Sequence, residues 1–251
     1  MKPPPLALVT GGKRRLGARI AERLAAAGYD LALVSHLDKD PEPELVAALH
    51  KAGVAWTCFT HNLTHLDPSP LISAVIAQFG RAPEVLVNNA AMFGQDDWES
   101  MTAETLQSHF QLNVFSPLLL TQAVVQSAEA GCRPAIINIL DQRIVNPHRD
   151  QLSYTLSKQA LAGSVRSMAA SLGARARVNA VAPGLVISTD DYTPKQEQRL
   201  AGMMPLGTLP APSGVADAVV YLAQAQDVTG QTIFVDGGAH LKSFDRDFMH
   251  L

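Results

Sequence analysis

The sequence predicts a single α/β domain of the Rossmann type, with a doubly wound parallel sheet of about seven strands and helices on both faces. Short apolar runs alternate with helix-length amphipathic segments along most of the chain, which is typical of a parallel sheet covered on both faces. A glycine-rich turn follows the first run, and polar motifs follow most of the later ones. In such a sheet, ligands bind at the carboxyl ends of the strands.

Seven runs have the length and composition of strands. They cover Leu6–Val9, Leu31–Ser35, Val54–Phe59, Val85–Val87, Ala135–Leu140, Arg177–Val181 and Thr232–Val235. After the first run, helical spacing places four apolar residues on one face, namely Leu16, Ile20, Leu24 and Ala27. No low-complexity linker or repeat divides the sequence, so we expect one domain over residues 1–251.

The composition bounds the function. Hydrophobic residues make up 47% of the chain and charged residues 17%, which is ample for a buried core. A net charge of -3 gives no reason to expect a nucleic-acid partner. The apolar stretches are too short to cross a bilayer and the N-terminus lacks a secretion signal, so we expect a soluble cytoplasmic protein. Cys58 and Cys132 stand in unlike contexts and predict neither a disulfide nor a metal pair.

The first polar motif is the turn Thr10-Gly11-Gly12-Lys13-Arg14-Arg15-Leu16-Gly17. A strand, a glycine turn and a helix start together form a phosphate site, because free amides and the positive end of the helix dipole face the anion. Gly11 and Gly17 have the strand before them and the helix after them that this interpretation requires. The alternative is a plain turn between a strand and a helix.

Tyr154 and Lys158 stand four residues apart, so on a helix they share a face. A lysine ammonium beside a phenol stabilises the phenolate and lowers the pKa of the phenol, which makes a proton donor for a hydride transfer. Asp141 ends the apolar run that precedes this pair. Because such pairs also arise by chance on helix surfaces, the interpretation depends on the other motifs.

Those motifs are predicted to lie at one edge of the sheet, since each follows a strand directly. Besides the glycine turn they are Ser35-His36, Asn62-Leu63, Asn88-Asn89-Ala90, Asp141 and Pro183-Gly184. His61 and His65 flank one of these turns rather than sharing a helix face, so we expect no metal site.

Residues 188–205 form a polar stretch after the sixth strand, where a segment would hang over the ligand edge. One interpretation is a substrate lid. The other is an ordinary surface loop with a short helix.

Taken together, the motifs resemble the short-chain dehydrogenase/reductase family over nearly the whole chain. The residues that carry the resemblance are Thr10-Gly11 with Gly17, Asn88-Asn89-Ala90, Asn113, Tyr154 with Lys158, Asn179, Pro183-Gly184 and Val235-Asp236-Gly237-Gly238. The resemblance implies that Tyr154 is the acid and that Lys158 lowers its pKa and binds the nicotinamide ribose. It also implies that Asn113 helps to hold a water linked to the lysine.

Two departures point to the pteridine reductase branch of that family, which includes dihydromonapterin reductases. Arg15 replaces the middle glycine of the turn, and Asp141 stands where the family has a catalytic serine. Phe93 matches the aromatic residue that stacks the pterin in that branch. Ala91 and Val186 replace polar residues of the branch, which suggests a less polar pocket.

The resemblance implies a set of binding residues. For the cofactor they are Gly11, Lys13, Arg14, Arg15, Leu16, Gly17, Ser35, His36, Asn62, Leu63, Asn89, Ala90, Tyr154, Lys158, Pro183, Gly184 and Ser188. For the substrate they are Arg15, Phe93, Asp141 and Tyr154.

The long apolar stretch Leu106–Val125 matches the helix that pairs subunits in the family, where a homotetramer is typical. Core packing within one subunit explains the same pattern.

An aspartate in place of the serine has a chemical consequence. An ionised carboxylate would repel the alkoxide that develops when a ketone is reduced. Hydrogen-bonded to the phenol, it can instead help relay a proton to a ring nitrogen. The alternative is that Asp141 only caps the following helix or binds a loop amide.

The expected cofactor is NADPH. An NAD-specific domain ends its second strand with an acid that binds the ribose 2'-hydroxyl, whereas here the strand ends in Ser35-His36, with Lys13 and Arg14 in the neighbouring turn. The negative charge of Asp38 opposes binding of a 2'-phosphate, and the positive charge of Lys39 beside it offsets that effect. The sequence therefore predicts an NADPH-dependent pterin reductase; the alternatives are a carbonyl or 3-oxoacyl thioester reductase and a non-catalytic dinucleotide sensor.

Overall fold

A seven-stranded, fully parallel sheet organises the computed structural model, which describes residues 3–37, 39–187 and 192–251. The order across the sheet is β3-β2-β1-β4-β5-β6-β7. Strands β2 and β3 are therefore added on one side of β1, and the strands from β4 onward are added on its other side. The strands are β1 (Leu6–Thr10), β2 (Asp30–Ser35), β3 (Trp56–Thr60), β4 (Val85–Asn88), β5 (Ala135–Ile139), β6 (Arg177–Pro183) and β7 (Thr232–Val235).

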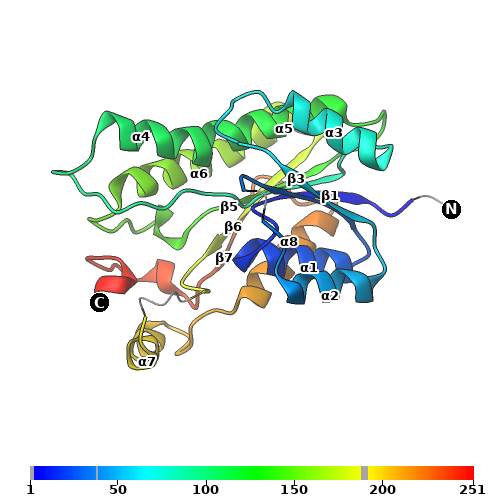
Figure 1. Cartoon of the computed structure of the whole chain (residues 1–251). Helices are drawn as coiled ribbons and strands as arrows, with labels where there is room; N and C mark the ends of the chain where they lie inside the picture. Colours follow the sequence, from blue (N-terminus) through cyan, green and yellow to red (C-terminus); the bar gives the residue numbers. More distant parts are fainter. Residues whose placement is uncertain (1–2, 38, 188–191) are drawn as a thin grey trace.

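Helices cover both faces of the sheet (Figure 1). One face carries α3 (Ser69–Phe79), α4 (Ala103–Phe110), α5 (Ser116–Ser127) and α6 (Leu152–Leu172), and the other carries α1 (Arg15–Ala26), α2 (Pro43–Ala52) and α8 (Pro212–Gln224). The remaining helix, α7 (Pro194–Met203), lies beyond the sheet near the C-terminal segment (Figure 1).

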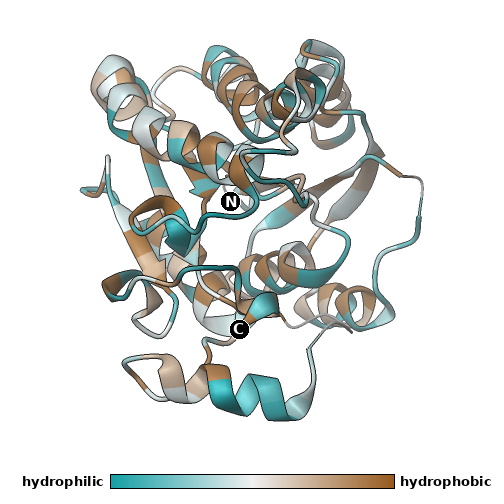
Figure 2. Ribbon diagram, turned by 90° about the vertical axis from the view of Figure 1, so that its left-hand side faces the viewer, coloured by the Kyte–Doolittle hydropathy of each residue, from teal (hydrophilic) through white to brown (hydrophobic). Residues whose placement is uncertain are grey.

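The core lies in two layers because strand side chains alternate between the faces. Val9 and Leu33 pack with Ile20 and Leu24 of α1 on one side. On the other side the neighbouring strand residues pack against α3, α5 and α6. The helices carry separate apolar and hydrophilic stripes (Figure 2), as expected for elements that bury one face.

All seven predicted strands are confirmed, with ends shifted by one or two residues, and so is the doubly wound architecture. The first helix differs in one respect. Ala27 is exposed, because α1 ends at Ala26 and the chain leaves the helix there. Gly17 and Ala21 complete its buried face instead.

The predicted apolar helix over Leu106–Val125 contains one wider turn. Between α4 and α5, residues Gln111–Phe115 form a π-helical turn. Pro117 has no N–H, so the carbonyl of Asn113 does not receive the usual helical hydrogen bond from the residue four positions later. Such turns often lie at functional sites, and this one contains Asn113.

Within the described ranges, no helix combines the length and the apolar character needed to span a membrane. The same residues contain no group of three or more metal-ligating side chains, and Cys58 and Cys132 do not form a disulfide.

Candidate active site

The glycine turn closes on the end of β4 through Thr10 and Asn89. The Thr10 hydroxyl accepts hydrogen bonds from the amides of Asn89 (2.9 Å) and Ala90 (3.0 Å), and the Asn89 side chain donates to the Thr10 carbonyl (2.9 Å). Gly11 has a φ of +64°, a conformation that glycine adopts without steric cost. A Cβ on Gly17 would collide with the Gly11 carbonyl, so the helix can meet the turn here only with glycine at position 17, and a Cβ on Gly11 would press on Asn89 and Ala90.

A cavity of about 570 Å³ lies between this turn and the ends of β2, β3 and β4. Most of the predicted cofactor residues line it: Gly11, Lys13, Arg14, Arg15, Leu16, Gly17, Ser35, His36, Asn62, Leu63, Asn89 and Ala90. Several of their polar groups already have partners. The Lys13 ammonium donates to the Lys39 carbonyl (2.9 Å), the Ser35 hydroxyl to the Leu37 carbonyl, and Asn62 accepts from Thr64.

Arg15, at the position where the family motif has a glycine, has a left-handed backbone conformation. Its φ is +54°, in the left-handed region that side chains disfavour. Its amide donates to the carboxylate of Glu42 (2.7 Å), and Glu42 also accepts from Arg19 (3.0 Å). Glu42 has no place in the family motif, so sequence reasoning missed this anchor of the turn.

The predicted catalytic pair, Tyr154 and Lys158, stands on α6, which begins just after the loop that follows β5. The Tyr154 hydroxyl donates to Oδ2 of Asp141 at 3.0 Å, and the Lys158 ammonium donates to the Ile139 carbonyl at 2.8 Å. The Phe93 ring meets the Tyr154 ring edge to face, with centroids 4.8 Å apart, and is about half exposed. The structure therefore brings Phe93, Asp141, Tyr154 and Lys158 together.

Asn113 connects the loop after β4 to α6. Its side chain accepts from the amide of Met92 (2.8 Å) and donates to the Met92 carbonyl (3.0 Å) and the Ser157 hydroxyl (2.9 Å). With 1% of its surface exposed, Asn113 fixes the start of the loop that carries Phe93 against the helix that carries Tyr154.

A buried arginine that the sequence did not single out holds the aspartate. Arg143 donates to Oδ1 of Asp141 through both its amide (2.9 Å) and Nε (3.1 Å). Its Nη1 donates to Gln151 and its Nη2 to Asp247 (2.6 Å). The guanidinium carbon lies 5.3 Å from the centre of the Tyr154 ring. Asp141 therefore caps the short 3-10 helix Gln142–Ile144, as one alternative expected, and also accepts a hydrogen bond from the phenol.

Burial raises the pKa of the Tyr154 phenol well above its usual value, the Asp141 carboxylate raises it further, and Arg143 opposes the shift. Burial also lowers the pKa of the Lys158 ammonium to about 8, with Asp141 opposing. The expected lowering of the phenol pKa by Lys158 is thus wrong for this structure, because burial and the facing Asp141 carboxylate outweigh the opposing effect of Arg143. At neutral pH Tyr154 carries a proton that it can donate.

The remaining predicted residues follow β6. The Gly184 amide donates to the Val235 carbonyl (3.1 Å), and a Cβ on Gly184 would press on Asp236, so Pro183 and Gly184 lie against the end of β7. Ser188 and Asp38 lie outside the described residues. The predicted lid over 188–205 contains α7, whose Leu200 is fully buried.

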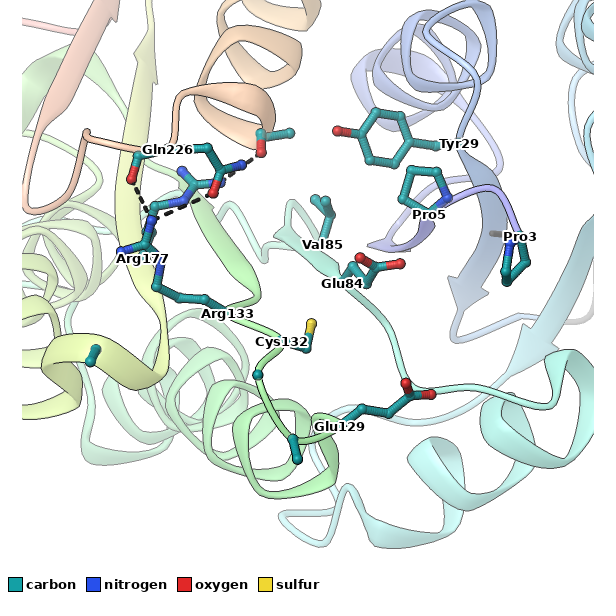
Figure 3. Close-up of a pocket in the computed structure, with 14 residues that line it drawn as sticks. Pro3, Pro5, Tyr29, Glu84, Val85, Glu129, Cys132, Arg133, Arg177 and Gln226 are labelled. Carbon is teal, nitrogen blue, oxygen red and sulfur yellow. Dashed lines mark hydrogen bonds between the residues drawn. The ribbon is translucent and has the colours of Figure 1, made fainter. Parts of the chain in front are cut away.

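A larger cavity, of about 830 Å³, opens at the opposite, amino-terminal edge of the sheet (Figure 3). Its cationic side chains have a structural task. Arg177 donates to the carbonyls of Leu222 (2.7 Å) and Ala223 (2.6 Å) at the C-terminal end of α8, and Arg133 donates to the Gln226 carbonyl (2.7 Å) just beyond that helix. The sequence motifs lie instead at the carboxyl edge.

Known proteins resemble this chain over nearly its whole length. A family model described as enoyl-(acyl carrier protein) reductase matches residues 11–240. The 3-oxoacyl-[acyl-carrier-protein] reductase FabG of Staphylococcus aureus is 30% identical over 256 residues, covering 96% of this chain and 100% of the relative. The 7alpha-hydroxysteroid dehydrogenase of Escherichia coli is 30% identical over 239 residues and covers 92% of each chain.

Among solved structures, the FolM alternative dihydrofolate reductase 1 of Brucella canis, complexed with NADP, superimposes with a TM-score of 0.87 at 30% identity and covers 95% of both chains. The matches to these relatives extend over nearly the whole chain. The chain belongs to the short-chain dehydrogenase/reductase family, as an oxidoreductase that uses a nicotinamide dinucleotide.

Proposed function

We propose that the protein is an NADPH-dependent reductase of a pterin, of the dihydropterin or dihydrofolate type. The observation that carries the proposal is the 3.0 Å hydrogen bond from the Tyr154 hydroxyl to a carboxylate, at the position where ketone-reducing relatives in the family have a serine. The structural similarity to a FolM alternative dihydrofolate reductase supports the same substrate class.

The residues present fit a dinucleotide. The cavity beside the glycine turn is about 570 Å³, and the turn permits close approach only because Gly11 and Gly17 lack side chains. Lys13, Arg14, His36 and Lys39 line the cavity, and a 2'-phosphate requires cations of this kind. The NADP in the FolM complex supports NADPH over NADH. Bound there, the cofactor would supply the hydride.

The chain's own residues would handle the proton and the substrate. Tyr154 holds a proton at its hydroxyl, because its pKa is raised, and gives it to a ring nitrogen. Asp141 accepts a hydrogen bond from that hydroxyl through Oδ2 and so orients it; once Tyr154 has given its proton to the substrate, Asp141 relays a proton from water to the phenolate. The half-exposed Phe93 ring offers a flat apolar surface beside the phenol for a planar heterocycle.

The direct test is a substrate comparison. Purified protein should oxidise NADPH faster with dihydrobiopterin, dihydromonapterin or dihydrofolate than without them. A 3-oxoacyl thioester, the second candidate because of the FabG relative, should give a much lower rate. Faster turnover of the thioester would replace the proposal with the second candidate. Binding of NADPH without turnover of either would leave the non-catalytic sensor.

Replacing Phe93 by Ala should chiefly weaken the binding of planar substrates. The substitution removes the ring that faces Tyr154 but leaves the phenol and its carboxylate in place. We expect the pterin KM to rise by roughly 10-fold, the value of one lost stacking contact, while KM for NADPH stays constant. Equal losses for a pterin and for an aliphatic ketone would contradict the stacking role.

Replacing Arg15 by Gly should separate the steric cost of the left-handed backbone at this position from the contribution of the side chain to substrate binding. Because Arg15 has a φ of +54°, glycine relieves about 1 kcal/mol of steric cost, so urea unfolding should show stability unchanged or raised. The pterin KM should rise because a cationic contact is lost. Arg14→Gly is the matched control, since Arg14 has an extended backbone and gains no such relief. Equal stability changes in both variants would contradict the strain argument.

The affinity for NADPH should fall as the pH rises through about 8. Burial lowers the pKa of Lys158 to about 8, so the ammonium that donates hydrogen bonds at neutral pH loses its proton above that value. Fluorescence titration of NADPH from pH 6 to 10 measures this. Lys158→Met should bind more weakly and lose this dependence; if it keeps the same pH dependence, another group causes it.

We further propose a cytoplasmic homotetramer. Supporting it, α5 continues the long apolar helix of the sequence, and the Phe115 side chain at its start is 42% exposed. Light scattering of the purified protein distinguishes a tetramer from a monomer.

A further inference from the structure

The C-terminal segment, residues 244–251, packs against the loop between β5 and α6, where the His148 ring contacts the rings of Phe244 and Phe248 edge to face. Phe244 and Phe248 pack with Leu200 and Met204 of the α7 region in a small core. The Gln196 side chain of α7 donates to the carbonyls of Phe248 (3.2 Å), Met249 (3.3 Å) and Leu251 (3.3 Å). The segment and α7 therefore form one packed unit at the carboxyl edge of the sheet.

One side chain of this segment reaches the active site. Asp247 is 4% exposed, and its Oδ2 accepts from Nη2 of Arg143 at 2.6 Å. Its Oδ1 accepts from the amide of Met249 (3.0 Å), and its own amide donates to both carboxylate oxygens of Asp150 (3.0 Å each). Both oxygens of Asp247 thus face donors.

Arg143 donates hydrogen bonds to both Asp141 and Asp247. Nε and the amide of Arg143 hold Oδ1 of Asp141, which leaves Oδ2 for the Tyr154 hydroxyl, while Nη2 is taken by Asp247. A guanidinium with a free Nη prefers to bind both oxygens of a carboxylate. Without Asp247, Arg143 would therefore compete with the phenol for Oδ2 of Asp141.

We propose that Asp247 is a positioning residue of the active site. By accepting a hydrogen bond from Arg143, it keeps one oxygen of Asp141 directed at the Tyr154 hydroxyl. Docking of the C-terminal segment is then a condition for catalysis, and α7 is connected to the proton donor through that segment. The inference rests on the proposed function, because it uses the roles of Asp141 and Tyr154 stated there.

The test is Asp247→Asn, measured with whichever pterin the wild type reduces. An amide has one oxygen, so it leaves either Nη2 of Arg143 or the Met249 amide facing an NH₂ group. We expect kcat to fall by roughly 10-fold to 100-fold, the effect of a small misplacement at a reacting centre. The pterin KM and the NADPH dissociation constant should stay within about twofold, since neither site contacts Asp247 in our proposal.

Two further variants separate positioning from folding. Asp247→Glu keeps the carboxylate and should recover most of kcat. Asp245→Asn makes the same charge change in the same segment, at an exposed ion pair with Arg149, and should leave kcat unchanged. Rates are divided by the concentration of NADPH-binding sites, so a loss of folded protein does not lower kcat.

An unchanged kcat in Asp247→Asn, or equal losses in the Asn and Glu variants with lowered melting temperatures, would overturn the inference. The wild type is assayed with pterins before any variant is made. If it reduces none, the proposed function fails, and the result is distinct from a failure of the inference about Asp247.

Discussion

Replacing Tyr154 by Phe should lower kcat by roughly 10² to 10⁴, the usual contribution of a positioned acid. The substitution removes only the hydroxyl that donates to Asp141 at 3.0 Å, and the ring keeps its edge contact with Phe93. Because Arg143 continues to hold Asp141, we expect the fold and the NADPH dissociation constant to stay close to those of the wild type.

Steady-state kinetics with a pterin, together with circular dichroism and NADPH titration, measure these quantities. Tyr221→Phe is the matched control, since Tyr221 is 54% exposed on α8 and takes no part in the site. A variant that turns over at the wild-type rate would remove Tyr154 from the mechanism. A variant that no longer binds NADPH would show that the hydroxyl supports the cofactor rather than the proton transfer.

Replacing Asp141 by Asn should lower pterin turnover by about 10² or more, because the relay oxygen facing the phenol is lost or becomes an NH₂ group. One negative charge is removed beside Arg143, whose side chain is 4% exposed and which, among the described residues, keeps Asp247 as its remaining ion-pair partner. We therefore also expect a loss of unfolding free energy of about 3 kcal/mol, the lower end for breaking a buried pair.

Asp141→Ser is the informative companion. A serine hydroxyl can donate to a developing alkoxide, which the carboxylate cannot, so the rate with a ketone or 3-oxoacyl thioester should rise relative to the rate with a pterin. Asp217→Asn, at an exposed ion pair with Arg23, controls for the loss of one charge. If Asp141→Asn reduces pterins as fast as the wild type, the carboxylate has no part in the proton relay.

The sequence predicted the sheet well because strands that are buried on both faces consist of continuous apolar runs. The ends of parallel strands meet at one edge, so the strand-end motifs also located the site. The cavity beside the glycine turn is lined by Gly11, Arg15, Asn62 and Asn89, residues separated by up to about 80 positions in the chain.

The network around Asp141 could not be predicted in this way. Arg143 and Asp247 are 104 residues apart in the sequence, and neither belongs to a spaced motif. A buried ion pair depends on tertiary packing that periodicity does not encode. The same holds for the phenol pKa: helical spacing placed Lys158 beside Tyr154, but burial and the facing carboxylate decide the direction of the shift.

The π-helical turn at Gln111–Phe115 has a consequence for how the chain tolerates changes in length. In an ordinary helix, deleting one residue rotates everything beyond it by about 100° and exposes a buried stripe. Here a deletion next to Asn113 could restore regular pitch and leave a stable helix, yet Asn113 would turn away from Met92 and Ser157. A folded but inactive protein is the expected product of that single deletion.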